Sequence, residues 1–309
     1  MSGADWIVPI LLTVITASTP LLFAATGELI AEKAGVLNLG VEGMMLIGAI
    51  FGFATASATD SGLLAIVAAA LAGGVMALIF AFLTLTMMAN QVATGLALTI
   101  FGVGFSALLG DDFVGYALEP LPQLEIPGLT AIPVIGPIFF GQDILVYLSF
   151  VAIGGVAWFL AKTRPGLILK AVGESHDSAH ALGYSVIRIR YLAVIFGGAM
   201  AGLGGAYLSL SYTPMWAENM TAGRGWIALA LVVFATWRPG RLLLGAYMFG
   251  AITILQLHAQ GAGFEVPSQV MSMLPYLATI LVLVLISRDR TKIRLNAPAC
   301  IGKVFRPAR

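Results

Sequence analysis

The sequence predicts an all-α membrane protein that crosses the bilayer several times. Of its 309 residues, 59% are hydrophobic and only 10% are charged, and the mean hydropathy is +0.97. Soluble globular domains carry about 25% charged residues, so this chain has too few to cover a surface that faces water. Apolar stretches long enough to span lipid recur along almost the whole chain. A water-soluble fold and a disordered chain are therefore both excluded.

Nine apolar stretches are each predicted to form a helix. Backbone polar groups within lipid must be bonded inside their own segment, and the short alternating strands of a barrel are absent from the sequence pattern. The seventh stretch is short for a span and is a candidate re-entrant segment. We interpret residues 1–309 as one transmembrane domain. The stretches are Ile7–Ala25, Leu37–Ala56, Leu63–Met87, Val92–Leu109, Ile144–Ala161, Tyr191–Tyr212, Gly225–Thr236, Leu242–Gln260 and Met271–Ser287.

The placement of Lys and Arg predicts the orientation. Basic residues gather in the segment 162–190, at Arg238 and Arg241, and in the tail 288–309. Cytoplasmic loops are enriched in Lys and Arg, so 162–190 is predicted to be a cytoplasmic loop and 288–309 a basic cytoplasmic tail. If all nine stretches cross, the N-terminus lies outside, the C-terminus lies inside, and only Arg224 among the basic residues lies outside.

The same orientation makes the acidic segment 110–142 an external loop. It contains five prolines and is expected to form an ordered but irregular cap over an entrance. The N-terminus has no basic flank before its first apolar run, so no cleaved signal peptide is predicted. The single cysteine, Cys300, forms no intramolecular disulfide.

Glycine supplies 36 residues, many of them inside apolar runs where helix propensity disfavours them. Small residues let membrane helices approach closely. Gly198 and Gly202, spaced by four and followed by Gly204 and Gly205, are predicted to serve helix packing rather than ligand binding.

Polar residues inside the second stretch indicate a possible solute pathway. Asn38 and Glu42 stand among Gly35, Gly40 and Gly43 in an otherwise apolar run. Charged residues in membrane segments mark pathways by default, and a broken helix can line a transport cavity near the bilayer midplane. The alternative is that Glu42 pairs with Lys33 or lies at the interface.

Two further polar clusters are weaker candidates for the same pathway. Trp216 and Asn219 could stack on a planar or sugar-like solute and hold its hydroxyls. The plainer interpretation gives Trp216 to the aromatic belt at the membrane interface and pairs Glu218 with Arg224. Gln91 follows Asn90 at the start of the fourth stretch, where helix capping or interhelical bonding is the simpler explanation.

The cytoplasmic loop contains a short helical pattern from Glu174 to Leu182, which Gly183 ends as a C-cap. His176 and His180 would share one face of this helix and resemble two metalloprotease ligands, but no third ligand is evident. We therefore expect a surface helix that docks on a soluble partner, with no metal site and no catalytic residue. Its docking residues are predicted to be Glu174, Ser175, His176, Asp177, Ala181, Leu182 and Gly183.

Three segments resemble bacterial ABC-transporter permeases of the nucleoside and simple-sugar group, which is similar to the branched-chain amino acid permeases. The segments are residues 32–45, 171–183 and 223–230, and the resemblance extends from about Thr19 to Arg288. One departure is the stretch 235–238, Ala-Thr-Trp-Arg, where the family is expected to be rich in glycine.

This resemblance implies a set of partners and a location. They are two ATP-binding subunits, a second and longer related permease, an extracytoplasmic substrate-binding protein and the lipid of a bacterial plasma (inner) membrane, without nucleic acid. It also implies that 174–183 is the coupling helix. The chain has no phosphate-binding loop, so ATP and Mg²⁺ would be bound by the partner ATPase and no cofactor by this chain.

The sequence therefore predicts a permease subunit of an ATP-driven importer for nucleosides or related simple sugars. A proton-coupled secondary transporter in which Glu42 or Glu218 titrates is the alternative. An intramembrane metalloprotease using His176 and His180 is disfavoured, because both residues lie in a loop with a basic, water-facing flank. Which solute is carried, and whether the permease pairs with a copy of itself, remain open.

Overall fold

The computed structural model describes residues 4–124, 127–130, 132–261 and 296–306, and isolated positions between 270 and 284. These residues form helices and loops, with no β-strand among them. The prediction of an all-helical membrane protein is confirmed. The helices are α1 (Ala4–Lys33), α2 (Val41–Thr59), α3 (Gly62–Ala81), η1 (Phe82–Thr86), α4 (Gln91–Gly110), η2 (Asp111–Phe113), α5 (Ile135–Phe140), α6 (Ile144–Lys162), α7 (Arg164–Glu174), α8 (His176–Ala181), α9 (Val186–Tyr207), η3 (Leu208–Tyr212), α10 (Arg224–Phe234) and α11 (Pro239–Gly261).

Seven helices in the described part are long and apolar enough to cross a membrane. They match seven of the predicted stretches, and they are α1, α2, α3 with η1, α4, α6, α9 with η3, and α11. The stretch Gly225–Thr236 forms α10, whose 11 residues extend about 16 Å, or half of a hydrocarbon core of about 30 Å. The stretch Met271–Ser287 lies largely outside the described residues, so the total number of crossings stays a prediction.

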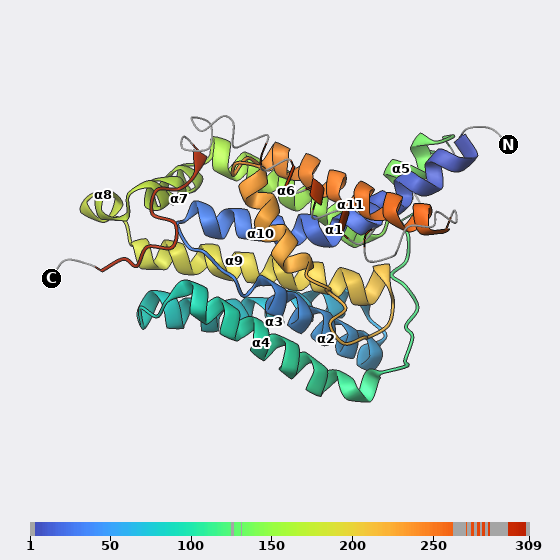
Figure 1. Cartoon of the computed structure of the whole chain (residues 1–309), viewed down its shortest axis with the longest axis horizontal. Coiled ribbons are helices and arrows are strands. Elements are labelled where there is room, and N and C mark those ends of the chain that lie inside the picture. Colours follow the sequence, from blue (N-terminus) through green and yellow to red (C-terminus); the bar gives the residue numbers. More distant parts are fainter. Residues whose placement is uncertain are drawn as a thin grey trace.

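The long helices lie side by side, and the loops gather at the two ends of the bundle (Figure 1). The start of α1 and the segment with α5 lie at one end, and α7 and α8 lie at the other (Figure 1). Residues 296–306 pack against α7 and α8: the Cys300 N–H donates to the Gly173 carbonyl at 2.9 Å, and the Phe305 ring contacts His176 and His180. The loop 162–190 and the described part of the tail therefore share one end, as predicted. Which end faces the cytoplasm stays a prediction.

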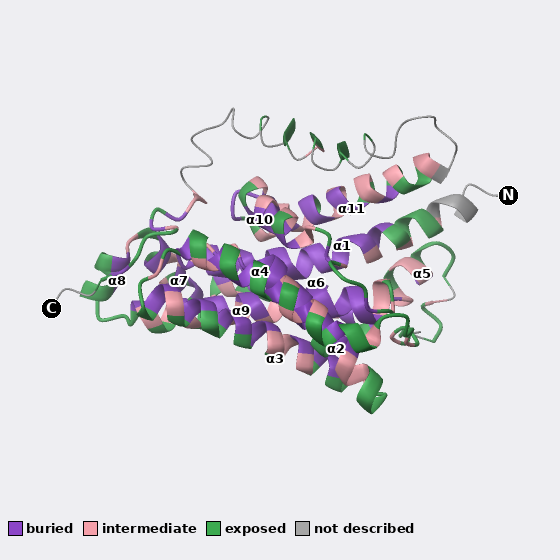
Figure 2. Cartoon of the chain, turned by 60° about the horizontal axis from the view of Figure 1, so that its bottom comes forward, coloured by how far each residue is buried: buried purple, intermediate pink, exposed green. Residues whose placement is uncertain are grey.

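Helix α9 lies in the centre, packed against α1, α2 and α3. Figure 2 shows buried residues along these helices and exposed ones on the outer faces of α3 and α4. A Cβ added to Gly202 would lie 2.2 Å from the Ala69 carbonyl oxygen, and one added to Gly48 would lie 2.3 Å from Gly202. The predicted packing role of the glycines on this helix is confirmed.

Helices α1 and α2 are separated by a break, as the glycines there predicted. Residues 34–40 are not α-helical, and all are buried or half-buried. Their backbone groups are bonded by side chains: Glu28 Oε1 accepts from the Asn38 N–H, and Gln91 Oε1 accepts from the Leu37 N–H. The break is thus held within the bundle by polar residues of α1 and α4.

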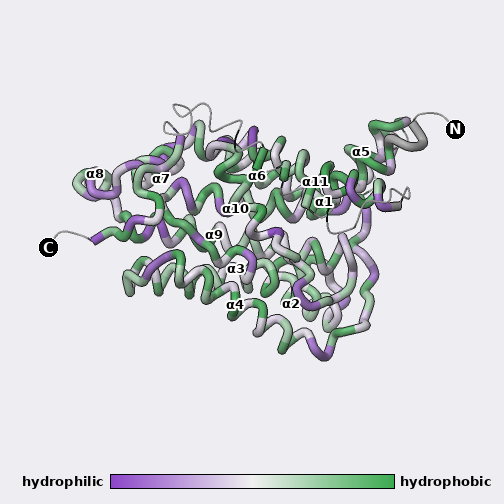
Figure 3. The backbone as a smooth tube through the Cα atoms, in the orientation of Figure 1, coloured by the Kyte–Doolittle hydropathy of each residue, from purple (hydrophilic) through white to green (hydrophobic). Residues whose placement is uncertain are grey.

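Within the predicted loop 110–142, the segment 111–124 is irregular and hydrogen-bonded to the bundle, whereas its external position and its role as a cap over an entrance stay predictions. The Leu118 N–H donates to the Pro214 carbonyl, and the Leu121 N–H donates to the Leu210 carbonyl. This segment lies over the residues that follow α9, at the end of the bundle away from α8. Figure 3 shows hydrophobic residues along the helices and hydrophilic ones around α7, α8 and the connecting loops.

Candidate functional site

The first candidate site follows one face of α4, where small and polar residues meet the break. The buried residues of α4 recur at helical spacing. A Cβ on Gly95 would lie 2.8 Å from the Leu39 nitrogen, and one on Gly102 would lie 2.5 Å from the Gly43 Cα. The Thr99 hydroxyl donates to the Leu39 carbonyl at 2.9 Å. Helix α4 therefore packs closely against both the break and the start of α2.

Glu42 joins α2 to the start of α10. Its Oε1 accepts from the Thr221 hydroxyl at 2.6 Å and from the Gly223 N–H at 2.8 Å, and its Oε2 accepts from the Gly225 N–H at 2.6 Å. A carboxylate at a helix N-terminus satisfies N–H groups that lack partners and interacts favourably with the helix dipole. Its carboxylate is thus committed to α10, and Lys33 instead donates to the Asn296 carbonyl at 2.7 Å.

Four of the five predicted pathway residues are buried in this chain. Asn38 is fully buried, and its Oδ1 accepts from the Gly40 N–H at 2.9 Å. Asn219 alone is exposed, with its backbone in the left-handed region at φ 53°. The buried residues are Asn38, Glu42, Gln91 and Trp216.

The structure divides these residues into two groups. Glu42 bonds directly to the segment 219–225, whereas Asn38 lies within the break and Gln91 contacts the start of the break. Trp216 lies farther along α2 and α4, packed with Ile50 and Phe53. A single site formed by all five side chains is therefore not present in this conformation.

Of the plainer structural interpretations of these clusters, the two for Trp216 and for Glu218 with Arg224 are wrong, and helix capping by Asn90 is confirmed. Trp216 is only 2% exposed, so it is not in an interfacial belt. Arg224 donates to the Met220 and Thr221 carbonyls and lies over the Tyr212 ring, so its charge is not paired with Glu218. Asn90 caps α4, with its Oδ1 accepting from the Ala93 N–H at 3.0 Å.

Two buried donors in this region lack a hydrogen-bond partner among the described protein groups. They are Gln91 Nε2 and Trp216 Nε1. A buried donor without a partner destabilises a structure by about 1–3 kcal/mol.

The second candidate site is the loop between α6 and α9. The prediction of one helix over 174–182 is wrong, because Ser175 is extended and divides two helices. Its hydroxyl caps α8 by accepting from the Ser178 N–H at 3.3 Å. Glu174 therefore ends α7, and α8 comprises only His176–Ala181. Gly183 follows with φ 88°, which confirms its role in ending the helix.

Helix α8 presents one buried and one exposed face. His176 is buried, whereas Asp177, Ala181 and Leu182 are exposed, and Leu182 is 75% exposed. His176 and His180 share a face as predicted, and both rings contact Phe305 at 5.3 Å between centroids. Both histidine rings therefore contact the tail, His176 from a buried position and His180 from an exposed one, while Asp177, Ala181 and the following Leu182 are exposed.

Arg190 anchors this loop and was missed as a structural residue. It is fully buried, and it donates to the Ala34 carbonyl at 3.1 Å and to the Lys303 carbonyl at 3.0 Å. Its guanidinium also faces His176 Nδ1 at 3.3 Å, and arginine only donates, so Nδ1 accepts. Burial, followed by the charge of Arg190, lowers the pKa of His176 below its ordinary value.

The signal for Arg190 was present in the sequence. It lies three and four residues before Ala193 and Val194, and seven before Gly197, so it falls on the buried face of α9. Arg190 was interpreted only as a member of the basic cluster in 162–190, so its place on the buried face of α9 was missed. In the stretch 235–238, Thr236 and Trp237 adopt left-handed backbone angles. Glycine adopts such angles most readily, which fits the expectation of a glycine-rich stretch there.

Comparison with known proteins identifies the family. Residues 10–285 match the family model described as branched-chain amino acid transport system, permease component. A protein of Haloferax volcanii, TsgC13, is 41% identical over 93% of this chain and 94% of its own length, and its name assigns it provisionally to a glucose ABC transporter as permease.

Two further relatives carry names for nucleoside transport. The nucleoside ABC transporter permease protein NupC of Lactococcus lactis is 34% identical over 87% of this chain and 89% of its own length. The guanosine ABC transporter permease protein NupQ of Bacillus subtilis is 33% identical over 90% of this chain and 92% of its own length. The chain therefore belongs to this family: it is a multi-pass permease subunit of an ABC transporter in the plasma membrane, and it is not an enzyme.

Proposed function

We propose that this permease imports nucleosides or related simple sugars. The observation that carries the proposal is its similarity, over almost the whole chain, to proteins named for nucleoside, guanosine and glucose transport. Nucleosides and sugars are uncharged solutes rich in hydroxyl groups. Buried amide and indole donors such as Gln91 and Trp216 suit hydroxyl and carbonyl oxygens.

Membership of the family implies ATPase subunits, a substrate-binding protein and a second permease as partners. Our proposal is more specific: two ATP-binding subunits, a longer related permease, and a binding protein on the extracytoplasmic side. ATP and Mg²⁺ would bind to the ATPases, because this sequence has no phosphate-binding loop.

Helix α8 is the proposed coupling element. Its exposed face, with Asp177, Ala181 and Leu182, would pack against an ATPase, together with the flanking Glu174, Ser175 and Gly183. Its buried face, with His176, is fixed to α9 through Arg190 and to the tail through Phe305. A force applied to the exposed face would therefore reach α9, which packs on α1, α2 and α3.

The solute pathway in this proposal follows the break between α1 and α2. Asn219 is exposed now, and Asn38, Glu42, Gln91 and Trp216 would line the opening when α10 and α4 move relative to α2. A ligand shifts such a cycle only if it binds the two states with different affinity. The binding protein and ATP would therefore each favour one state.

Replacement of Leu182 tests the coupling assignment. Leu182→Ala should leave the amount and stability of the assembled transporter within about 0.5 kcal/mol of wild type, because the side chain is exposed. ATP-driven uptake should fall about tenfold, which corresponds to roughly 1.4 kcal/mol. The matched control is Leu244→Ala, on an exposed leucine of α11. Normal uptake in Leu182→Ala would remove the assignment.

The substrate class is tested on the complete transporter in vesicles. Uptake of radiolabelled guanosine should be competed by other nucleosides more strongly than by glucose if the carrier is a nucleoside importer. The reverse order would assign it to sugars, and competition by neither class of solute would reject both. Uptake that continues with the ATPases inactivated would favour the proton-coupled alternative.

A further inference from the structure

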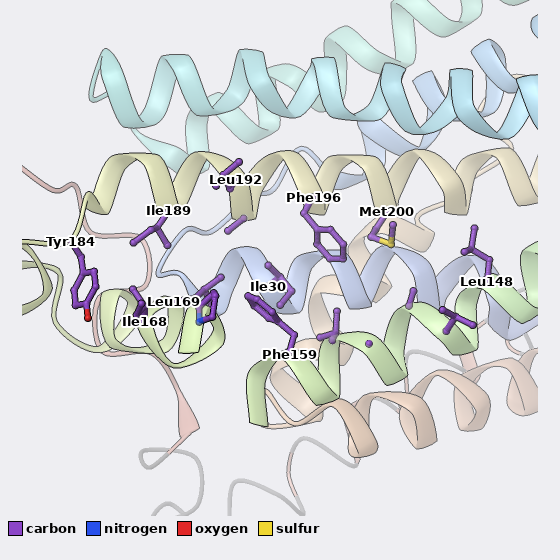
Figure 4. Close-up of a pocket in the computed structure, with 16 residues that line it drawn as sticks. Ile30, Leu148, Phe159, Ile168, Leu169, Tyr184, Ile189, Leu192, Phe196 and Met200 are labelled. Carbon is purple, nitrogen blue, oxygen red and sulfur yellow. The ribbon is translucent and has the colours of Figure 1, made fainter. Parts of the chain in front are cut away.

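A long apolar groove lies between α6 and α9, outside the candidate site described above. Its volume is about 650 Å³, and Ile30 of α1 and Ile168 of α7 also line it (Figure 4). Every side chain in its lining is apolar except that of Tyr184, which has one hydroxyl group. This volume falls in the range of about 300–1,000 Å³ that is typical of small-molecule sites. The groove therefore suits a hydrocarbon ligand.

The groove is as long as one leaflet of a bilayer. On α6 its lining extends from Leu148 to Phe159, and on α9 from Ile189 to Met200. At 1.5 Å per residue each of these segments covers about 16 Å. Half of the hydrocarbon core is about 15 Å deep. The dimensions therefore fit a single acyl chain that lies parallel to the two helices.

Tyr184 and Ile168 of α7 line one end of the groove (Figure 4), and three basic residues lie near them in the sequence. Lys162, Arg164 and Arg188 are all exposed. Each follows or precedes a lining residue of its own helix by three or four positions, which places both on the same helix face. The lining residues concerned are Phe159 for Lys162, Ile168 for Arg164, and Leu192 for Arg188.

Negative charge is scarce around these three cations. The sequence has no Asp or Glu at positions 144–173 or 178–217, which include all of α6 and α9. Tyr184 lies at the same end of the groove, and tyrosine favours the boundary between headgroups and acyl chains. Clusters of basic residues between membrane helices bind anionic lipid headgroups.

We propose that this groove binds an anionic phospholipid. One acyl chain lies between α6 and α9, and the headgroup phosphate is held by Lys162, Arg164 and Arg188. The bound lipid is thus in contact with both helices that carry the α7–α8 loop. The proposal does not depend on which solute is transported or in which direction.

Filling the groove is the first test. Gly154 and Gly155 are adjacent and exposed on α6, and a Cβ on either has no atom within 4 Å, but only Gly155 lines the groove. The complete transporter is exchanged into equimolar phosphatidylglycerol and phosphatidylcholine, and retained lipid is measured by native mass spectrometry. Gly155→Phe should reduce retained phosphatidylglycerol about tenfold. Gly154→Phe should retain it as wild type does. Equal retention in the two variants would overturn the proposal.

Removing the cations is the second test. The double variant Lys162→Gln/Arg188→Gln should lose the preference for phosphatidylglycerol over phosphatidylcholine while still retaining a lipid. The matched control is Lys303→Gln/Arg306→Gln, which removes the same charge from exposed positions at the same end of the molecule. An unchanged preference in the first variant, or equal losses in both, would contradict headgroup recognition.

A photo-crosslinking residue at Leu192 separates lipid from protein as the occupant. Leu192 lines the groove and is 62% exposed. With p-benzoylphenylalanine at this position in the assembled transporter, the adduct should have the mass of a phospholipid. An adduct with the second permease, or with residues 271–287 of this chain, would show that protein fills the groove and would overturn the proposal.

Discussion

The carboxylate of Glu42, in the first turn of α2, accepts the Gly225 N–H at 2.6 Å and so fixes the start of α10 inside the bundle. Helix α10 is too short to cross the bilayer, and its buried N-terminus would otherwise leave N–H groups without partners. A residue that first suggests a solute or proton site thus has a structural partner 183 residues away in the sequence.

Glu42→Gln should destabilise the protein while leaving the fold recognisable. The amide keeps one acceptor oxygen but places an NH₂ group toward backbone donors, so at least one N–H of α10 loses its partner. We expect a loss of about 1–3 kcal/mol in the free energy of unfolding. Thermal unfolding of the purified transporter measures it, with Glu119→Gln, an exposed glutamate, as control. Unchanged stability with abolished uptake would instead support a direct transport role for Glu42.

Phe305→Ala should release α8 from the tail. The ring contacts both His176 and His180 and packs in a small cluster with Val172, Ala179 and Val186. Truncating a buried phenylalanine destabilises its surroundings by about 3 kcal/mol or more. Amide hydrogen exchange in α8 should accelerate, while exchange in α9 stays slow.

Val304→Ala is the matched control for this change, because the neighbouring valine is exposed. It should leave exchange in α8 as in wild type. If the two variants behave alike, the tail does not stabilise α8.

The attachment of α8 should weaken in acid. Burial and Arg190 lower the pKa of His176, with Asp177 and Lys303 also facing the ring. The pKa of His176 in the folded protein lies below its ordinary value of about 6.5, so below that pH the unfolded loop binds more protons than the folded loop does. The stabilisation is complete above about pH 6.5 and is lost as the pH falls through the lowered pKa.

Hydrogen exchange of α8 measured between pH 7.5 and 5.0, corrected for intrinsic rates, checks this expectation. His176→Asn should reduce the dependence on pH, whereas His258→Asn, at an exposed position on α11, should preserve it. A dependence that survives in His176→Asn would assign the titration to another group.

Gly202→Val should prevent α3, α2 and α9 from packing together. A Cβ at this position would lie 2.2 Å from the Ala69 carbonyl oxygen, and the nearest atoms are all backbone of α3, so no flexible group can yield. Overpacking typically destabilises by about 1–3 kcal/mol, and we expect a value at or above the upper limit. The yield of folded protein in detergent provides the measure, and Gly104→Val, in open space on α4, provides the comparison.

The helical segments could be predicted because hydropathy reports on each segment alone. Apolar length placed seven helices, the short seventh stretch indicated α10, and Gly183 was correctly read as a C-cap. Asn90 as a cap was equally local, since its partner Ala93 is three residues away.

The polar contacts could not be predicted, because they join residues far apart in the sequence. Arg190 bonds to the Ala34 carbonyl 156 residues away, and Trp237 donates to Glu32 205 residues away. Local spacing instead suggested a pair between Glu218 and Arg224 and a continuous helix from Glu174. Ser175 ended that helix because its hydroxyl gains more as a cap for α8 than it would inside a helix.

Asp143 connects the start of α6 to the end of α9. Its Oδ1 caps α6, and its Oδ2 accepts from the Ser211 hydroxyl at 2.7 Å in the π-helical turn that ends α9. The ends of α6 and α9 farthest from α8 are thus pinned together, and the loop with α7 and α8 connects their other ends. The two helices are thus tied at both ends and separated along their length by the groove between them, so a displacement of α8 would be transmitted to both.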